Sequence, residues 1–155
     1  MQLTEIKKYL HHREPYLMLS SVVEIDDSAI HVVCDHRGDE GHLLGHFPGA
    51  PIVPGAMLQE ICTQAAGLLI TKHYCPVENY DSEITQGYAL GVLNKVRFAK
   101  YLEIVKPSHS IEAKIELLER EGTLFKFSAK VFQQGKLKAK LGFNLVNISD
   151  SYLKG

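Results

Sequence analysis

Residues 45–60 read GHFPGAPIVPGAMLQE and join a stiff loop to the start of an apolar segment. Between His46 and Gly55, three prolines fix backbone angles and remove hydrogen-bond donors, so this part follows a path that is not regular structure. From Ala56 to Thr71 there is no proline, and the residues are apolar on nearly every side of a helix. A helix of that kind is buried, so we expect it at the centre of the fold.

Segments with the residue pattern of β-strands flank this helix in the sequence. β-Branched and apolar residues dominate the first two, and apolar residues alternate with polar ones in the later segments. The six expected strands are 17–25, 29–34, 87–98, 110–120, 123–133 and 136–147. Asp26, Gly122 and Gly135 lie between neighbouring segments and suit tight hairpin turns. The sequence thus predicts an α+β fold, one long buried central helix wrapped by an antiparallel sheet of about six strands, with a short helix at 3–10.

Length and composition limit the classes of protein to which this chain can belong. With 155 residues and 45% apolar content, it has enough chain for one domain with a core and too little for two, so we expect a single domain over residues 1–155. The longest apolar run, at 65–70, is far shorter than a membrane span. The N-terminus lacks the pattern of a secretory signal, and three cysteines without Cys-x-x-Cys spacing favour a reducing compartment. These features predict a cytoplasmic protein without a membrane span.

The net charge of −1 hides an uneven distribution of charge. Lys and Arg outnumber Asp and Glu within residues 95–140, whereas the rest of the chain is acidic. This basic region could receive an acidic partner, but many of its lysines alternate with apolar residues, as on the solvent-exposed face of a sheet. Near-neutral overall charge and the lack of a zinc-finger, helix-turn-helix or aromatic-basic motif disfavour nucleic-acid binding.

Two titratable residues are candidates for chemistry, His46 in the loop and Glu60 in the helix. The sequence neighbours of Glu60 include several apolar residues, and a carboxyl group buried among them needs a partner or a function. One interpretation is an acid–base pair that faces an apolar cavity, and the other is a structural Glu60 hydrogen-bonded to Gln64. Pro54-Gly55 opens the helix, where amides without intrahelical acceptors could bind an oxyanion.

The segment 35–55 is rich in Gly, His and Pro, and long loops of this kind are often functional. His36, His42 and His46 lie close together in it and raise the question of a metal site. Gly45 argues against one helix that would align them, and no paired acidic or cysteine ligand stands at zinc-like spacing. We therefore expect neither a metal site nor a cofactor.

The loop and the helix start resemble the signature of the FabZ-type 3-hydroxyacyl-acyl-carrier-protein dehydratases. That signature is His-Phe-Pro-Gly-x-Pro-(Val/Ile)-x-Pro-Gly followed by a helical Glu, and His46 and Glu60 stand fourteen residues apart, as its catalytic pair does. Residues 12–17, HREPYL, and 96–98, VRF, resemble two further segments of that family. The resemblance therefore covers nearly the whole chain.

The resemblance implies a hot-dog fold and the dehydration of 3-hydroxyacyl thioesters on acyl carrier protein to trans-2-enoyl thioesters, as in fatty-acid-type biosynthesis. In that reaction His46 removes the proton on C2, the Gly55 amide polarises the thioester carbonyl, and Glu60 protonates or orients the leaving hydroxyl. Phe47 and Pro54 are expected to contact the substrate beside Gly55. Glu rather than Asp at position 60 resembles the FabZ-like branch rather than the FabA-like one, so no isomerase activity is expected.

The resemblance also implies an assembly: a homodimer or a trimer of dimers, with His46 of one subunit facing Glu60 of the other, so that a monomer is inactive. Leu43-Leu44, where the family often has aromatic residues, could reshape the pocket mouth and leaves the chain length of the substrate open. A second departure is PSH at 107–109, where the family has Pro-Gly-Asp. Two other functions stay open, a hot-dog acyl thioesterase and a non-catalytic acyl-chain binding subunit, and the intact pair argues against both.

Overall fold

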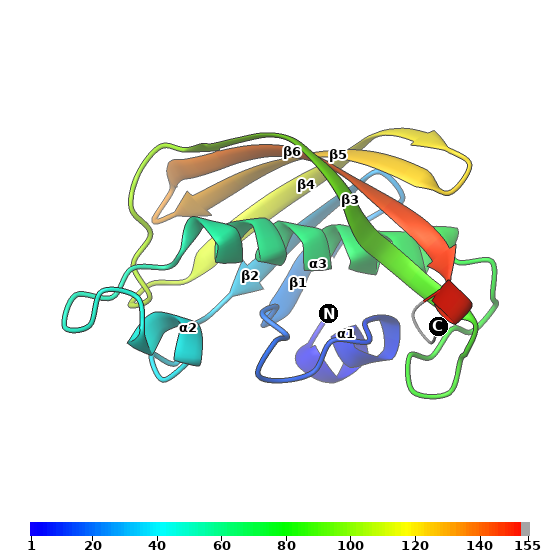
Figure 1. Ribbon diagram of the computed structural model, residues 1–155, viewed down its shortest axis with the longest axis horizontal. Coiled ribbons are helices and arrows are strands. Elements are labelled where there is room, and N and C mark those ends of the chain that lie inside the picture. Colours follow the sequence, from blue (N-terminus) through cyan, green and yellow to red (C-terminus); the bar gives the residue numbers. More distant parts are fainter. Residues whose placement is uncertain (153–155) are drawn as a thin grey trace.

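The long helix α3 (Gly55–Tyr74) lies against one face of a six-stranded antiparallel sheet in the computed structural model of the chain (Figure 1). The structure describes residues 1–152. The other elements are α1 (Leu3–Tyr9), β1 (Ser21–Ile25), β2 (Ala29–Cys34), α2 (Gly41–Leu44), β3 (Tyr88–Tyr101), β4 (Ile111–Glu121), β5 (Leu124–Gln133), β6 (Lys136–Ser149) and the 3₁₀ helix η1 (Asp150–Tyr152). No helix within residues 1–152 has the length and apolar character needed to cross a membrane. The domain expected from the sequence extends to residue 155, so residues 153–155 of it lie outside the described part.

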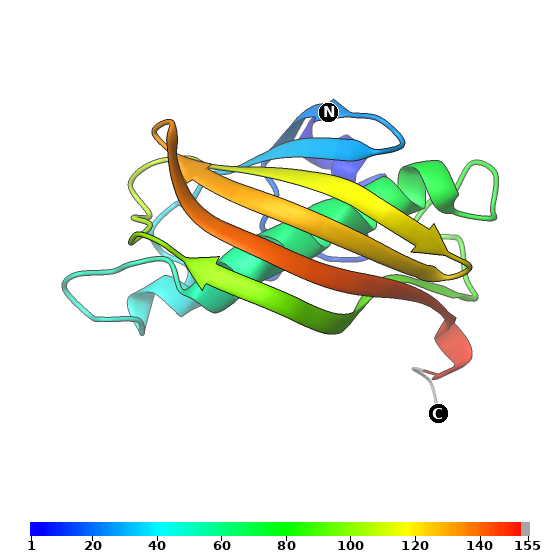
Figure 2. The same ribbon diagram turned by 90° about the horizontal axis from the view of Figure 1, so that it is seen from above.

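The strands are ordered β1-β2-β4-β5-β6-β3, and every neighbouring pair is antiparallel. β4, β5 and β6 follow one another as hairpins, whereas β3 pairs with β6 at the edge of the sheet. Figure 2 shows these strands crossing over α3 at an oblique angle. The pairing places Phe127 opposite Phe143, and the ring of Phe127 also stacks on that of Phe125. The alternation in the sequence thus turns one face of each strand towards the helix.

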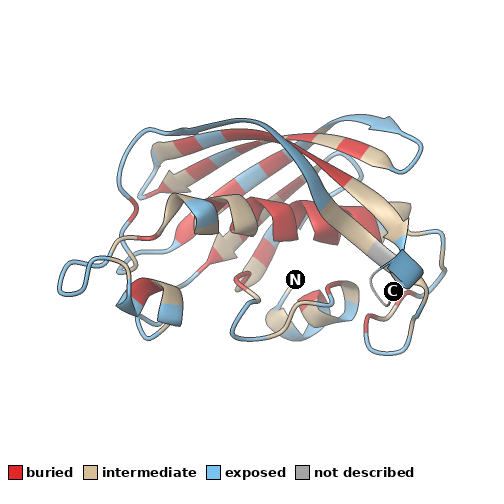
Figure 3. Ribbon diagram, in the orientation of Figure 1, coloured by how far each residue is buried: buried red, intermediate tan, exposed pale blue. Residues whose placement is uncertain are grey.

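Helix α3 is buried because the sheet covers one side of it and α1 approaches from the other (Figure 3). Residues 61–71 are all buried, and Ile6 and Leu10 join the same core. The helix and β3 approach so closely that a Cβ added to Gly91 would lie 2.9 Å from the Cα of Gly67. Gly91 also has a φ of 73°, so glycine is required at this crossing for two reasons.

The predicted fold class is confirmed, since one long buried helix packs on six antiparallel strands. The first strand, however, starts at Ser21 rather than at residue 17. Its predicted beginning is diverted because the N–H of Met18 donates to the side chain of Gln64 instead of to a neighbouring strand. The segment 35–55 contains the one-turn helix α2, and α3 ends at Tyr74, beyond the predicted Thr71.

Strand β3 forms an open edge of the sheet. One side of it pairs with β6, and within residues 1–152 no strand lies on its other side. Large apolar side chains on and just after this strand are exposed: Leu93, Val96, Phe98, Tyr101, Leu102 and Ile104. An edge with these properties is a surface on which a strand of another chain can pair.

Candidate active site

The loop between α2 and α3 carries His46 and is held at both ends. The N–H of His46 donates to the carbonyl of Leu43 at 3.2 Å, so the loop leaves α2 directly. The N–H of Val53 donates to the carbonyl of Val105 at 2.8 Å, which ties the other end to the chain that follows β3. Between these points Phe47 adopts a left-handed φ of 56°, and the tip turns back on itself. The backbone around His46 is therefore fixed from both sides.

His46 is half-buried, and one hydrogen bond sets the orientation of its ring. Its Nδ1 lies 2.9 Å from the carbonyl oxygen of Ile52. Because a carbonyl only accepts, Nδ1 carries the hydrogen, and in the neutral ring the free lone pair is on Nε2. The Phe47 ring packs on the imidazole with the ring centroids 4.6 Å apart. Nε2 is therefore the atom of His46 that can take up a proton.

The N-terminus of α3 offers amide groups beside this loop. Pro54 is the N-cap residue and no side chain caps the helix, so the first amides, beginning with that of Gly55, have no intrahelical acceptor. The Tyr101 ring lies over Gly55, where an added Cβ would come within 3.1 Å of ring atoms. A hollow of about 400 Å³ opens here, and Gly55, Leu58 and Tyr101 are among the residues that line it. The arrangement can bind a carbonyl oxygen that gains negative charge.

Glu60 is held by Gln64, one helical turn further along α3. The Gln64 Nε2 donates to Glu60 Oε1 at 2.9 Å. The Gln64 amide has only one orientation, because its oxygen accepts the N–H of Met18 and its nitrogen also donates to the carbonyl of Tyr16, each at 2.9 Å. The hydrogen bond expected for a structural Glu60 is therefore present, and it fixes Oε1 as an acceptor.

Two residues that the sequence did not single out, His12 and Tyr16, also lie against Glu60. His12 Nε2 is 4.0 Å from Glu60 Oε1, and the His12 ring stacks on that of Tyr16 with centroids 5.7 Å apart. Burial lowers the pKa of His12, and the charge of Glu60 opposes that shift. Desolvation and a hydrogen bond to Glu60 raise the pKa of Tyr16. The segment HREPYL carried a family resemblance, but nothing in its local pattern indicated a contact with α3.

The structure groups the predicted site residues in two places. Pro54 and Gly55 form the start of α3, and His46 and Phe47 lie on the preceding loop, where His46 is bonded to Ile52, whereas Glu60 lies about 7.5 Å further along the helix axis than Gly55. Within residues 1–152, His46 is bonded to Ile52, Glu60 is bonded to Gln64 of the same helix and lies 4.0 Å from His12, and no hydrogen bond or ion pair joins His46 to Glu60.

Comparison with known proteins decides the family. Residues 10–141, which include the whole loop and all of α3, match the family described as the FabA-like domain. The chain belongs to this family. The 3-hydroxyacyl-[acyl-carrier-protein] dehydratase FabZ of Coxiella burnetii is 30% identical over 141 residues, covering 90% of this chain and 94% of that protein. The FabZ of Syntrophobacter fumaroxidans is 32% identical over 140 residues, covering 90% of this chain and 89% of that protein.

Solved structures support the fold of this FabA-like chain. The dehydratase heterocomplex ApeI:P from Xenorhabdus doucetiae superposes with a TM-score of 0.76 at 19% identity, over 96% of this chain and 94% of that chain. A hypothetical thioesterase from Streptococcus pneumoniae, solved with coenzyme A, gives a TM-score of 0.59 at 18% identity, over 83% and 85% of the two chains. The predicted hot-dog fold is thereby confirmed. Because one fold hosts both kinds of protein, the fold alone does not fix the reaction.

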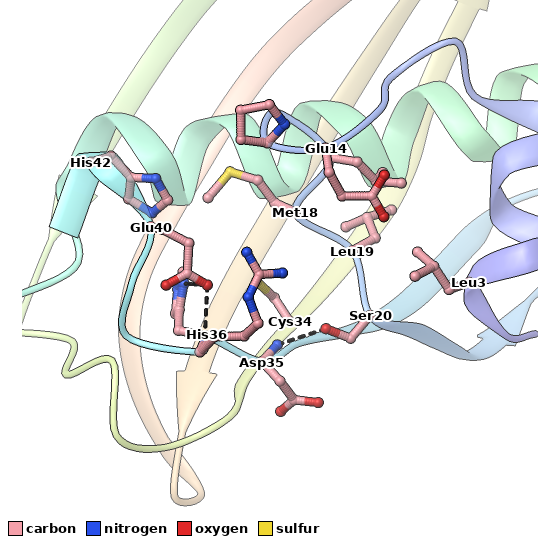
Figure 4. A pocket seen from close by; sticks show the side chains of 13 residues that line it. Leu3, Glu14, Met18, Leu19, Ser20, Cys34, Asp35, His36, Glu40 and His42 are labelled. Atoms are coloured by element: carbon pink, nitrogen blue, oxygen red, sulfur yellow. Dashed lines mark hydrogen bonds and ion pairs between the residues drawn. The ribbon is translucent and has the colours of Figure 1, made fainter. Parts of the chain in front are cut away.

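The other two histidines of the predicted loop, His36 and His42, lie at a separate cavity of the FabA-like domain (Figure 4). This cavity has a volume of about 170 Å³, and His46 is not among the residues that line it. The rings of His36 and His42 are 5.7 Å apart, and Glu40 Oε1 lies 3.7 Å from His36 Nδ1. Burial lowers the pKa of His36, and the charge of Glu40 opposes the shift. In the described part of the chain, no three His, Cys, Asp or Glu side chains are arranged to hold a metal ion.

Proposed function

We propose that this chain dehydrates 3-hydroxyacyl thioesters carried by acyl carrier protein and releases trans-2-enoyl thioesters. The observation that carries the proposal is that the imidazole of His46 is fixed by the carbonyl of Ile52, a residue that lines the hollow at the uncapped start of α3 together with Gly55. Relatives of similar length that are named 3-hydroxyacyl-[acyl-carrier-protein] dehydratases support the same reaction. This chain has three free cysteines, Cys34, Cys62 and Cys75. Free thiols fit our proposal that the protein acts in the reducing cytoplasm.

Three groups divide the proposed reaction between them. His46 takes the proton from C2 on its Nε2, and the charge that develops on the thioester oxygen is stabilised by the Gly55 amide. The C2–C3 double bond then forms as the C3–O bond breaks, and the hydroxyl leaves as water with a proton delivered or oriented by Glu60. The hydrogen bond from Gln64 supports this role because it fixes the position of the Glu60 carboxyl group. No cofactor takes part in these steps.

Phe47 and Pro54 have supporting roles in the proposed site. The Phe47 ring is 61% exposed and packs on His46, so it offers an apolar surface to the substrate next to the base. The carbonyl of Pro54 accepts the N–H of Met57 at 2.9 Å, which starts the helix and sets the direction of the Gly55 amide. We therefore assign Phe47 to substrate contact and Pro54 to the geometry of the carbonyl site.

We further propose that the complete site forms between two copies of the chain. His46 and Glu60 make no contact with one another in a single copy, and the apolar edge of β3 ends at Tyr101, directly over Gly55. Pairing along this edge would bury the exposed apolar side chains and bring His46 of one copy towards Glu60 of the other. The chain would then assemble as a homodimer or as a trimer of dimers. This arrangement makes an isolated monomer inactive.

Absorbance of the conjugated enoyl thioester tests the reaction. Purified protein is mixed with a short 3-hydroxyacyl thioester, and His46→Ala and Glu60→Gln serve as controls. A signal that both variants abolish supports the dehydratase. Release of free thiol without the enoyl signal would instead assign a thioesterase, and neither product across several chain lengths and carriers would favour a non-catalytic acyl-chain binding subunit.

A mixing experiment tests the shared site. His46→Ala and Glu60→Gln are unfolded together, refolded and assayed. If each site combines His46 of one copy with Glu60 of the other, half of the dimers are mixed and each has one intact site, so about a quarter of the wild-type activity returns. No recovery from a mixture that contains verified heterodimers would overturn the shared site.

A further inference from the structure

The register of the sheet aligns lysines from four neighbouring strands on its outer face. Lys114 of β4 lies opposite Lys130 of β5, Lys130 opposite Lys140 of β6, and Lys140 opposite Lys100 of β3. All four side chains are exposed. Because neighbouring strands are about 4.8 Å apart, these residues form a line roughly 14 Å long. We call them the lysine row.

The lysines of the row form no ion pair within the described part of the chain, although Lys114 lies over the Phe132 ring and lines a hollow with Glu24 and Glu116. Like charges directly opposite one another on neighbouring strands destabilise a sheet. Elsewhere on the sheet, Lys126 and Lys138 form ion pairs with glutamates at 2.6 Å. Within residues 1–152, no lysine of the row has a carboxylate within 4.0 Å. Like charges in register on neighbouring strands with no ion pair to offset them are typical of a functional surface.

The row lies at the end of the sheet that adjoins the candidate active site. Lys100 directly precedes Tyr101, whose ring lies over Gly55. Tyr101 in turn pairs with Ala139, the neighbour of Lys140. In Figure 2 the end of β3 and the start of β6 lie at the same end of the molecule as the start of α3. Lys100, at one end of the row, is therefore the neighbour along β3 of a residue that lines the hollow at Gly55, with the two side chains on opposite faces of the strand.

We propose that the lysine row is the docking surface for an acidic face of the carrier protein that delivers the substrate. This inference rests on the proposed function and adds the surface that binds the partner. Carboxylates on one face of a helix recur about every 5–6 Å, close to the spacing of the row. A helix with such a face could pair with the lysines while the thioester arm enters beside Tyr101. Charge complementarity of this kind mainly speeds encounter and fixes orientation.

The test compares two substrates and two variants. The first variant replaces three residues, Lys114→Gln, Lys130→Gln and Lys140→Gln. The control is Lys8→Gln, because Lys8 is an exposed lysine of α1 and lies outside the sheet. Each protein is assayed with a 3-hydroxyacyl chain on the carrier protein and with the same chain on N-acetylcysteamine, which has no protein surface.

We expect the triple variant to raise KM for the carrier-borne substrate about tenfold with kcat nearly unchanged. KM for the small thioester should stay at the wild-type value with both variants. Added salt should raise the wild-type KM for the carrier-borne substrate and have much less effect on the triple variant, since screening and charge removal act on the same interaction. The melting temperature of the triple variant should equal or exceed that of the wild type, because the substitutions remove repulsion.

Two results would overturn the inference. One is an unchanged KM for the carrier-borne substrate in the triple variant; the other is an equal loss with both substrates, which would give the lysines a structural role. Binding of the carrier protein without an acyl chain, measured by calorimetry, tests the row even if the wild type dehydrates neither substrate. Weakened binding of a DNA duplex together with unchanged carrier binding would also reject the inference and assign the row to nucleic acid.

Discussion

The loop at 45–54 and the inner face of β4–β6 are ordered by different means. In the loop, prolines and left-handed residues fix the backbone, while Phe47 stays exposed and His46 half-buried. On the inner face, Phe127 and Phe143 have no exposed surface, and their positions come from packing. The difference indicates that substitutions in the loop should change the chemistry with little effect on stability, and substitutions on the inner face should do the reverse.

The largest expected effect is that of His46→Ala on activity. Removing a general base lowers kcat by roughly 10²- to 10⁴-fold. Since the ring is half-buried and makes one hydrogen bond, the free energy of unfolding should change by only about 0.5–1.5 kcal/mol. Enoyl absorbance and urea denaturation measure the two quantities. A loss of stability large enough to explain the loss of activity would contradict the proposal that substitutions in the loop change the chemistry and leave the fold stable.

On the other side of the comparison, Phe127→Ala should destabilise the fold by about 3–5 kcal/mol, because it leaves a cavity under the sheet. The control is Phe132→Ala on the same strand, whose side chain is only partly buried on the outer face. That change should cost less than half as much. Equal midpoints in urea for the two variants would contradict the assignment of the two faces.

Gly55→Ala should have a smaller effect, a loss of about tenfold in kcat/KM with the fold retained. The added Cβ would press on the Tyr101 ring at 3.1 Å and displace either the ring or the start of α3. Gly45→Ala is the matched control, since its Cβ would meet only the Gly41 carbonyl oxygen at 3.8 Å. Loss of activity in both variants would mean that loop flexibility, rather than the geometry at Gly55, limits the reaction.

The rates at which a disulfide reagent modifies the three cysteines test how well the core is protected from solvent. Burial raises the pKa of Cys34 and of Cys62 to about 12, whereas Cys75 is only half-buried. At pH 8, a disulfide reagent should therefore modify Cys75 first and the two core thiols at least roughly 10²-fold more slowly. All three should react together in denaturant. Rapid modification of three thiols in the native protein would show that the core opens easily.

The smallest expected effect is a change in the pH dependence of stability at His12. Burial lowers its pKa in the folded state, so the unfolded chain binds the proton first as the pH falls through the ordinary value of 6.5. The contribution of neutral His12 to the free energy of unfolding is therefore present above that pH and is lost on acidification. His12→Asn should flatten part of the decrease in melting temperature between pH 7 and 5, whereas the exposed His109→Asn should not. If the melting temperature depended on pH in the same way in both variants, the effect could not be assigned to His12.

Much of the fold followed from local pattern. The buried helix was predicted because Ala56 to Thr71 is apolar on nearly every side, and the strands β4–β6 because their apolar residues alternate. The start of β1 was wrong, since Met18 makes its hydrogen bond with a side chain 46 residues away. His12 and Tyr16 were missed at the site for the same reason, because their contacts with Glu60 join segments distant in the chain.

The amino-acid order alone was enough for the stiff loop and for the faces of the strands. These features depend on backbone restrictions and on side-chain periods that act over a few residues. The packed chain decided which residues surround Glu60, that β3 lies at an open edge, and that four separate lysines form one row. Strand order and register depend on how the whole chain buries its apolar surface, so no single segment contains them.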